Sequence, residues 1–206
     1  MSFRLTEDEG RFLVKLARRS ISSIIITGEP IEDSSNYPPK LQEKCGVFVT
    51  LNTVKNGMEE LRGCIGYPEP IFPLVKATID SAISAATRDP RFPPVSSQEL
   101  NDIIIEVSVL TPPTLIEVKK PIDYVNEVQI GRDGLIVERG MLKGLLLPQV
   151  PVEWKWNLEE FLAQCCMKAG LAPDMWLVKG TRIYKFQAII FKENMPNGEV
   201  EQVKIS

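Results

Sequence analysis

An asparagine–glycine pair, Asn56-Gly57, separates two runs of residues that predict β-strands. Residues 45–51 precede the pair, and residues 59–65 follow it as the returning strand. Asparagine and glycine both accept a positive φ angle, which a two-residue hairpin turn requires. The pair therefore predicts an antiparallel hairpin and argues against a sheet built from parallel βαβ units.

Helix signals in three other segments complete the fold prediction. Residues 6–9 (TEDE) form a capping box for a helix that ends near Gly28, and Asn157 caps a later helix. Residues 70–88 predict a further helix, which the prolines of residues 89–94 must end. More strands are expected at residues 103–110, 135–138, 145–147 and 182–193. Because helices and strands do not alternate, we expect an α+β fold of mostly antiparallel sheet flanked by helices.

The composition excludes several classes of function. The chain has 206 residues, no histidine and a formal net charge of −3. Without histidine, the Ser-His-Asp and Cys-His catalytic arrangements and the common zinc sites are excluded. The charge balance and the absence of a long basic run argue against a nucleic-acid partner. Metal, phosphate-loop and dinucleotide motifs are also missing, so we expect no cofactor.

The cysteines and the apolar segments indicate the cellular compartment. Cys45, Cys64, Cys165 and Cys166 include no C-x-x-C motif, and the first residues resemble no export signal. Without a signal peptide, such cysteines are expected as reduced thiols. No apolar stretch approaches the roughly 18 residues that a membrane span needs. We therefore expect a cytoplasmic protein with no membrane partner.

The hexapeptide of residues 61–66, LRGCIG, is the strongest candidate for a functional segment. Gly63 and Gly66 flank Cys64, and glycines within a strand indicate a bulge or a close approach of another backbone. Arg62 lies two residues from Cys64, and a neighbouring guanidinium can lower a thiol pKa and favour the nucleophilic thiolate. The alternative is that Cys64 is a small buried packing residue.

Arg91 and Phe92 lie in the proline-rich segment of residues 89–94. An arginine and an aromatic ring on a rigid loop suit the recognition of an anionic or planar group. The alternative is structural, with Arg91 paired to Asp89 and Phe92 anchoring the loop in the core.

Two glutamates are further candidates. Glu106 interrupts the apolar strand of residues 103–110, whose odd-numbered residues should face the core. It is either satisfied by an arginine or exposed in a cleft, where a raised pKa would let it act as acid or base. Glu153 stands beside Trp154 and Trp156 as a candidate binding rim, unless the tryptophans belong to the core.

The hexapeptide resembles the hallmark of the AMMECR family, which is named for a human chromosomal region. Other segments resemble that family in the same order, namely residues 89–94, 106–113, 130–134, 144–150 and the stretch from Glu153 to residue 171. The resemblance runs from about residue 6 to residue 193. It identifies the chain as one domain over residues 1–206, with a polar tail at 194–206 and a form similar to prokaryotic single-domain members.

The resemblance implies a fold and a location for the site. Similar proteins have an α+β fold with a larger and a smaller subdomain, and the hexapeptide lies near the cleft between the two. The biochemical activity of the family is unassigned. A Memo-like protein and a radical-SAM protein often accompany prokaryotic members, which implies them as pathway partners.

Three functions remain open from the sequence. The first is an enzyme or enzyme component for a small anionic or peptide-like ligand, with Cys64 as nucleophile or anchor and Glu106 as acid or base. Its ligand-binding residues would be Arg62, Gly63, Gly66, Arg91, Phe92 and Glu153. The second is a non-catalytic adaptor or binding module for a Memo-like or radical-SAM partner, with an inert thiol. The third is a nucleic-acid-associated factor whose basic stripe the fold would have to assemble.

Overall fold

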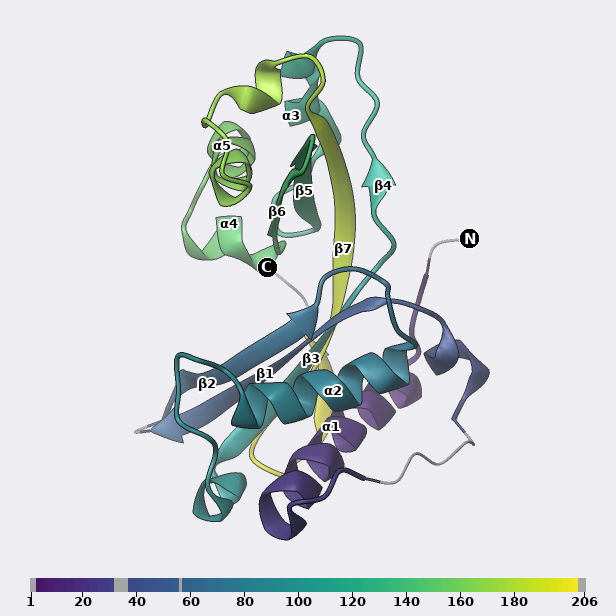
Figure 1. Ribbon diagram of the computed structural model, residues 1–206, viewed down its shortest axis with the longest axis vertical. Helices are drawn as coiled ribbons and strands as arrows, with labels where there is room; N and C mark the ends of the chain where they lie inside the picture. Colours follow the sequence, from purple (N-terminus) through teal and green to yellow (C-terminus); the bar gives the residue numbers. More distant parts are fainter. Residues whose placement is uncertain (1–2, 32–36, 56, 204–206) are drawn as a thin grey trace. The chain divides into compact units, whose positions relative to one another are not determined.

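The computed structural model describes residues 3–31, 37–55 and 57–203. Within these residues the chain has an α+β fold with an antiparallel sheet, as predicted (Figure 1). The helices are α1 Glu7–Thr27, α2 Leu74–Thr87, α3 Tyr124–Glu127, α4 Gln149–Glu153 and α5 Leu158–Lys168. The strands are β1 Gly46–Lys55, β2 Met58–Tyr67, β3 Ile103–Leu110, β4 Thr114–Leu115, β5 Asp133–Arg139, β6 Leu142–Leu146, β7 Arg182–Glu193 and β8 Val200–Val203.

The chain divides into two compact units. Unit 1 comprises the described residues of Met1–Leu110 and Ile189–Val203, and unit 2 comprises Thr111–Ala188. Hydrogen bonds link six strands in the order β2-β1-β3-β7-β5-β6, while β4 and β8 both pair with β7. The division therefore falls within β7, which contributes residues to each unit.

In unit 1, the antiparallel strands β2, β1 and β3 carry α1 and α2 on one face (Figure 1). The hairpin prediction is confirmed by the pairing of β1 with β2. Asn56 lies outside the described residues, and Gly57 has a φ of +76°. The odd-numbered residues of β3 are buried against the helices as predicted, in a core of Leu13, Val14, Leu16, Val47, Val49, Leu51, Leu74, Ile103, Ile105, Val107 and Val109.

The first helix matches its predicted bounds because both of its ends carry local signals. Thr6 and Glu9 form the reciprocal capping box, and Gly28 ends the helix with a φ of +77°. Helix α2 begins later than expected, directly after Pro73, because the residue before a proline is disfavoured in the helical region.

A buried ion pair anchors α1 to the sheet of unit 1. The Nε of Arg18 donates to the Oε1 of Glu193 at 2.6 Å, and the guanidinium also donates to the backbone carbonyls of Leu100 and Ile103. The other carboxylate oxygen of Glu193 accepts from the backbone N–H of Ile105 at 3.0 Å. Because Glu193 is only 3% exposed, these contacts satisfy a charge that has little access to water.

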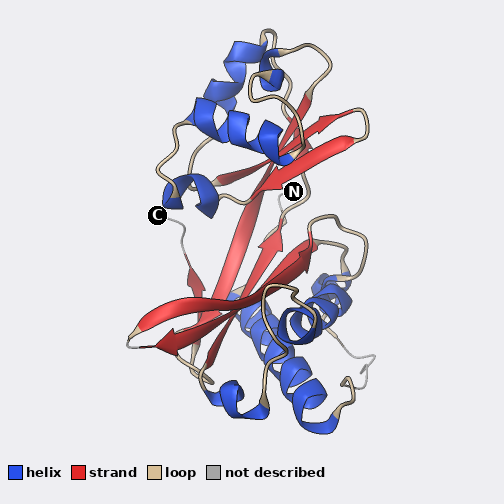
Figure 2. Ribbon diagram, turned by 60° about the vertical axis from the view of Figure 1, so that its left-hand side comes forward, coloured by secondary structure: helices blue, strands red, loops and turns tan. Residues whose placement is uncertain are grey.

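In unit 2, α5 packs on the hairpin formed by β5 and β6 (Figure 2). Asn157 and Glu160 form the capping box of α5, which confirms the predicted start of this helix. The tight packing requires Gly144, because a Cβ there would lie 2.4 Å from the backbone nitrogen of Ala169. The core of the unit comprises Leu135, Val137, Phe161, Leu162, Cys165, Cys166, Trp176 and Ile183.

Strand β7 has its predicted bounds, whereas β4 and β8 were not predicted. Strand β8 lies within the segment that the sequence indicated only as a polar tail, and it pairs antiparallel with the end of β7. All four cysteines are free. None of the helices in the described part of the chain has the length and apolar character that a membrane crossing requires.

Candidate functional site

The hexapeptide lies in β2, which ends the strand order of the sheet. Leu51 in β1 opposes Gly63, but Asn52 opposes Leu61, so Arg62 is the extra residue of a β-bulge. The predicted irregularity in this strand is thus confirmed.

Both glycines of the hexapeptide are required by close backbone contacts. A Cβ on Gly63 would lie 2.3 Å from the carbonyl oxygen of Ala85 in α2. A Cβ on Gly66 would lie 2.2 Å from the carbonyl oxygen of Val47 in β1. The glycines therefore let β2 approach its neighbours closely, which is a packing role.

Arg62 is committed to an internal ion pair. Its Nε donates to Glu99 at 2.7 Å, and a second guanidinium nitrogen donates to the same carboxylate at 3.2 Å. Chiefly through these contacts, Arg62 lowers the pKa of Glu99 to about 2. Glu99 lies in the short 3₁₀ helix η2, Ser97–Asn101. Because the Arg62 side chain is only 11% exposed, it is poorly placed to bind an anion from solution.

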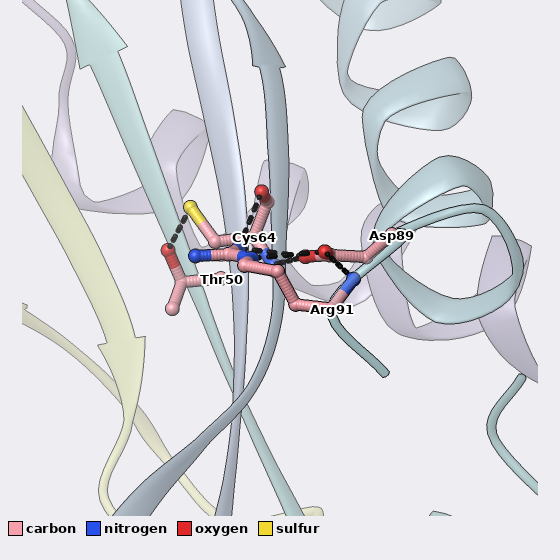
Figure 3. Close-up of polar contacts among 4 residues, drawn as sticks. All are labelled: Thr50, Cys64, Asp89 and Arg91. Carbon is pink, nitrogen blue, oxygen red and sulfur yellow. Dashed lines mark hydrogen bonds and ion pairs between the residues drawn. The ribbon is translucent and has the colours of Figure 1, made fainter. Parts of the chain in front are cut away.

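An aspartate–arginine pair holds the backbone of Cys64 at the outer edge of β2 (Figure 3). The backbone N–H of Cys64 donates to Asp89 at 2.9 Å, and Arg91 donates to the carbonyl oxygen of Cys64 at 3.2 Å. Asp89 and Arg91 are themselves joined at 2.7 Å. The two side chains thus occupy the hydrogen-bonding positions of a neighbouring strand. We call these three residues and their contacts the edge clamp.

The carboxylate of the edge clamp is almost fully buried. Asp89 is 4% exposed, and its hydrogen bonds to Arg91 hold its pKa well below the usual range. The structural alternative for Arg91 is therefore confirmed as far as the ion pair is concerned. Phe92 is half-buried, and the guanidinium carbons of Arg62 and Arg91 lie 5.9 and 5.4 Å from its ring centroid.

The thiol of Cys64 accepts a hydrogen bond from the hydroxyl of Thr50 at 3.3 Å (Figure 3). Burial raises the pKa of this thiol, and the negative charges of Glu106 and Asp89 act in the same direction. The Thr50 hydrogen bond and the charge of Arg91 oppose the rise without cancelling it. The expectation that Arg62 activates the thiol is wrong, because the bulge directs Arg62 to Glu99 and the nearby guanidinium belongs to Arg91.

Three polar side chains form a row across the sheet of unit 1. In the strand register, Thr50 opposes Cys64 on β2 and also Glu106 on β3. Val49 and Leu51, on either side of Thr50, are in the core, so by strand alternation the row faces away from the helices. All three residues of this polar row are half-buried. Glu106 also accepts a hydrogen bond from the hydroxyl of Ser108 at 3.3 Å.

Glu153 lies in unit 2, at the end of α4, where it is exposed. The other candidate residues all belong to unit 1. Trp154 is also exposed, whereas Trp156 packs against the core of unit 2. The core alternative for the tryptophans therefore holds for Trp156 and is wrong for Trp154.

Sequence reasoning missed Thr50, although the hairpin carried a signal for it. Counting back from a two-residue turn places Thr50 opposite Gly63. The bulge at Arg62 adds one residue and brings Cys64 opposite Thr50 instead. The flanking glycines predict a bulge, and adding its extra residue to this count would have identified Thr50 as the residue opposite Cys64.

The four cysteines differ in their access to solvent. Cys45, Cys165 and Cys166 are buried, and Cys64 is half-buried. Burial raises the pKa of Cys45 to about 11 and that of Cys165 to about 12. Among the described residues, no group of three or more cysteine, aspartate or glutamate side chains is placed to hold a metal ion.

Comparisons with known proteins agree with the fold. The profile of the AMMECR1 family matches residues 14–191. Protein PH0010 of Pyrococcus horikoshii is 54% identical over 203 residues, and protein MJ0810 of Methanocaldococcus jannaschii is 53% identical over 201 residues; each match covers 98% of both chains. The crystal structure of the uncharacterised PH0010 superposes with a TM-score of 0.87 and covers 97% of this chain and 98% of that one.

Proposed function

Because the chain belongs to the AMMECR1 family and its relatives' names state no activity, we propose a function from the geometry of unit 1. The protein is a non-catalytic binding module that docks a peptide-like segment of a partner protein beside the hexapeptide. Cys64 contributes to the shape of this surface and performs no covalent chemistry.

The edge clamp is the observation that carries this proposal. A catalytic thiol needs a lowered pKa, but burial raises the pKa of Cys64. The two arginines that could bind an anionic substrate are engaged with Glu99 and Asp89. The charged groups of the motif are therefore engaged in ion pairs that stabilise β2 and its neighbours.

The polar row supplies hydrogen-bonding groups suited to a peptide. Thr50 offers a hydroxyl, Cys64 a neutral thiol and Glu106 a carboxylate, so donors and acceptors lie side by side on three adjacent strands. Leu61 opposes Asn52 in the register and so lies on the same face of the sheet as Thr50. Its side chain is 43% exposed and can contact an apolar group of the bound segment.

The Memo-like and radical-SAM proteins implied by the family resemblance are the partners to test first. Each purified protein is titrated into this one by isothermal calorimetry. We expect Leu61→Glu to weaken binding at least tenfold, because it places a charge in the apolar contact. The matched control is Met141→Glu in unit 2, since Met141 is 100% exposed. Equal affinities for the two variants would refute the location of the site.

A thiol enzyme acting on a peptide-like ligand is the second candidate. It is favoured by one observation, the half-buried state of Cys64 where the other three cysteines are buried. The test is the pH dependence of alkylation by iodoacetamide, followed by peptide mass spectrometry. A binding module predicts a midpoint at Cys64 above the free-thiol value of about 8.5. A midpoint below that value would support the enzyme, with Cys45 and Cys165 as slow internal controls.

A further inference from the structure

The corner between α4 and α5 in unit 2 presents an unusual pair of aromatic rings. Trp154 is 68% exposed, whereas Trp156 packs against the core of the unit. The two rings are stacked, with centroids 6.1 Å apart and planes inclined by 20°. Trp154 therefore packs on the ring of Trp156, which the core of the unit holds in place, and much of the Trp154 indole is exposed to solvent.

The backbone holds this pair in a fixed arrangement. Lys155, between the two tryptophans, has a φ of +55°, a backbone conformation that residues other than glycine rarely adopt. Backbone hydrogen bonds from Trp154, Lys155 and Trp156 to carbonyls of α4 measure 3.1, 3.2 and 2.9 Å. Strained conformations persist where surrounding contacts enforce them, and they cluster at ligand-binding sites.

The charges around the pair favour a cationic ligand. Glu153 directly precedes Trp154, and Glu159 lies in the first turn of α5, so these two carboxylates outnumber the one ammonium group of Lys155; Glu160 is engaged in the capping box of α5. Indole binds a cation over its face better than the other aromatic rings, and guanidinium also stacks flat against it. In the part of the chain that the structure describes, the rings with a cation over them are phenylalanines, so the face of Trp154 takes no internal cation.

We propose that Trp154 and Glu153 form a binding site for an arginine side chain of a partner protein. The guanidinium stacks on the open face of Trp154, and the adjacent carboxylate of Glu153 supplies the opposite charge. This site lies in unit 2 and does not depend on the function proposed for unit 1.

Nuclear magnetic resonance of the indole N–H groups tests the proposal directly. The ¹⁵N-labelled protein has three such signals, from Trp154, Trp156 and Trp176. It is titrated with acetyl-Gly-Arg-Gly-amide and, separately, with the citrulline peptide, which has nearly the same shape without the charge. We expect a saturable shift at Trp154 with the arginine peptide, and binding of the citrulline peptide roughly three- to thirtyfold weaker, because citrulline loses both the exposed cation–π contact and the ion pair with Glu153. Equal shifts with both peptides, or no saturation, would overturn the site.

Two variants with matched chemistry separate the role of Glu153 from a general charge effect. Glu153→Gln should weaken binding of the arginine peptide about two- to fivefold, as for an exposed ion pair, whereas Glu117→Gln, at another exposed position of unit 2, should leave it unchanged. Trp176 is buried in the core of unit 2, so its unchanged signal shows that each variant is folded. Wild-type affinity in Glu153→Gln, or equal losses in both variants, would contradict the assignment.

Discussion

Replacing Asp89 by asparagine removes the charge of the edge clamp while keeping the shape of the side chain. The carboxylate accepts hydrogen bonds from the backbone N–H of Cys64 and from both the backbone and the side chain of Arg91. Asparagine retains a single acceptor oxygen, and its NH2 group cannot accept a hydrogen bond from the guanidinium. At least one charge-assisted bond is therefore lost in a site that is 4% exposed.

The expected loss of stability in Asp89→Asn depends on which of the groups that lose a hydrogen bond can still be reached by water. A hydrogen bond to a charged group contributes about 1.5–3 kcal/mol, and an unsatisfied buried N–H costs about 1–3 kcal/mol. The Arg91 side chain is 52% exposed, so water replaces part of its lost contact. We expect Asp89→Asn to lower the free energy of unfolding by about 2 kcal/mol and the Tm by roughly 4–8 °C. Asp89→Ala, which also leaves the Cys64 N–H unpaired, should cost roughly 3–4 kcal/mol.

Unit 2 contains a matched control for this substitution. Asp133 pairs with Arg132 at 2.6 Å, with side-chain exposures of 2% and 48%, against 2.7 Å, 2% and 52% for Asp89 and Arg91. Asp133→Asn should therefore cost a similar amount of stability. Only Asp89→Asn should accelerate hydrogen exchange of the Cys64 amide, by roughly tenfold or more, because only Asp89 accepts from it.

The pH dependence supplies an independent check. Because the pKa of Asp89 is lowered in the folded protein, its charge stabilises the fold above the unfolded pKa of about 3.9. This stabilisation is lost as the pH falls from about 4 toward the lower folded-state pKa. In urea unfolding, the difference in the free energy of unfolding between wild type and Asp89→Asn should have its full value at pH 6 and should decrease below about pH 4. The clamp would be refuted if this difference in the free energy of unfolding stayed the same at low pH, or if hydrogen exchange of the Cys64 amide were as slow in Asp89→Asn as in wild type.

Three further substitutions test other parts of unit 1. Gly63→Ala should destabilise the protein by about 1–3 kcal/mol in urea unfolding, because its Cβ meets the carbonyl of Ala85; a neutral effect would mean that α2 moves freely. Glu193→Ala should cost about 3–5 kcal/mol, since it leaves the Arg18 guanidinium buried without its partner; a loss under 1 kcal/mol would show that water enters. Cys64→Ser should change the Tm by only a few degrees, because the clamp uses the backbone of this residue; failure to fold would make the thiol a packing residue.

Most helices and strands could be predicted because their signals are local. Thr6 and Asn157 supply capping boxes within one turn of the helices that they begin, and Gly28 ends the first helix. The hairpin of β1 and β2 likewise depends on adjacent residues. Strand β8 escaped prediction because its residues are exposed apart from Val200, and only pairing with β7, close in space, makes them a strand.

Part of the candidate site could also be predicted, because its signals are local in the sequence. The flanking glycines correctly indicated a bulge and close backbone contacts, which are properties of the strand itself. The partners of each charged side chain could not be predicted, because Glu99 lies 37 residues from Arg62 and Asp89 lies 25 residues from Cys64. A single extra residue at the bulge then decided which arginine lies near the thiol.

The two ion pairs of the hexapeptide have a joint consequence for recognition. Both carboxylates, Asp89 and Glu99, come from the segment after α2, and both bind residues of β2. This segment thus covers the outer edge of the strand at Cys64, where an extended partner would otherwise add by backbone pairing. Under the proposed docking function, the side-chain face of the sheet with its polar row is the surface that a partner would use. On that proposal, substitutions at Thr50 and Glu106 should alter the affinity for the partner, while substitutions in the clamp should alter stability.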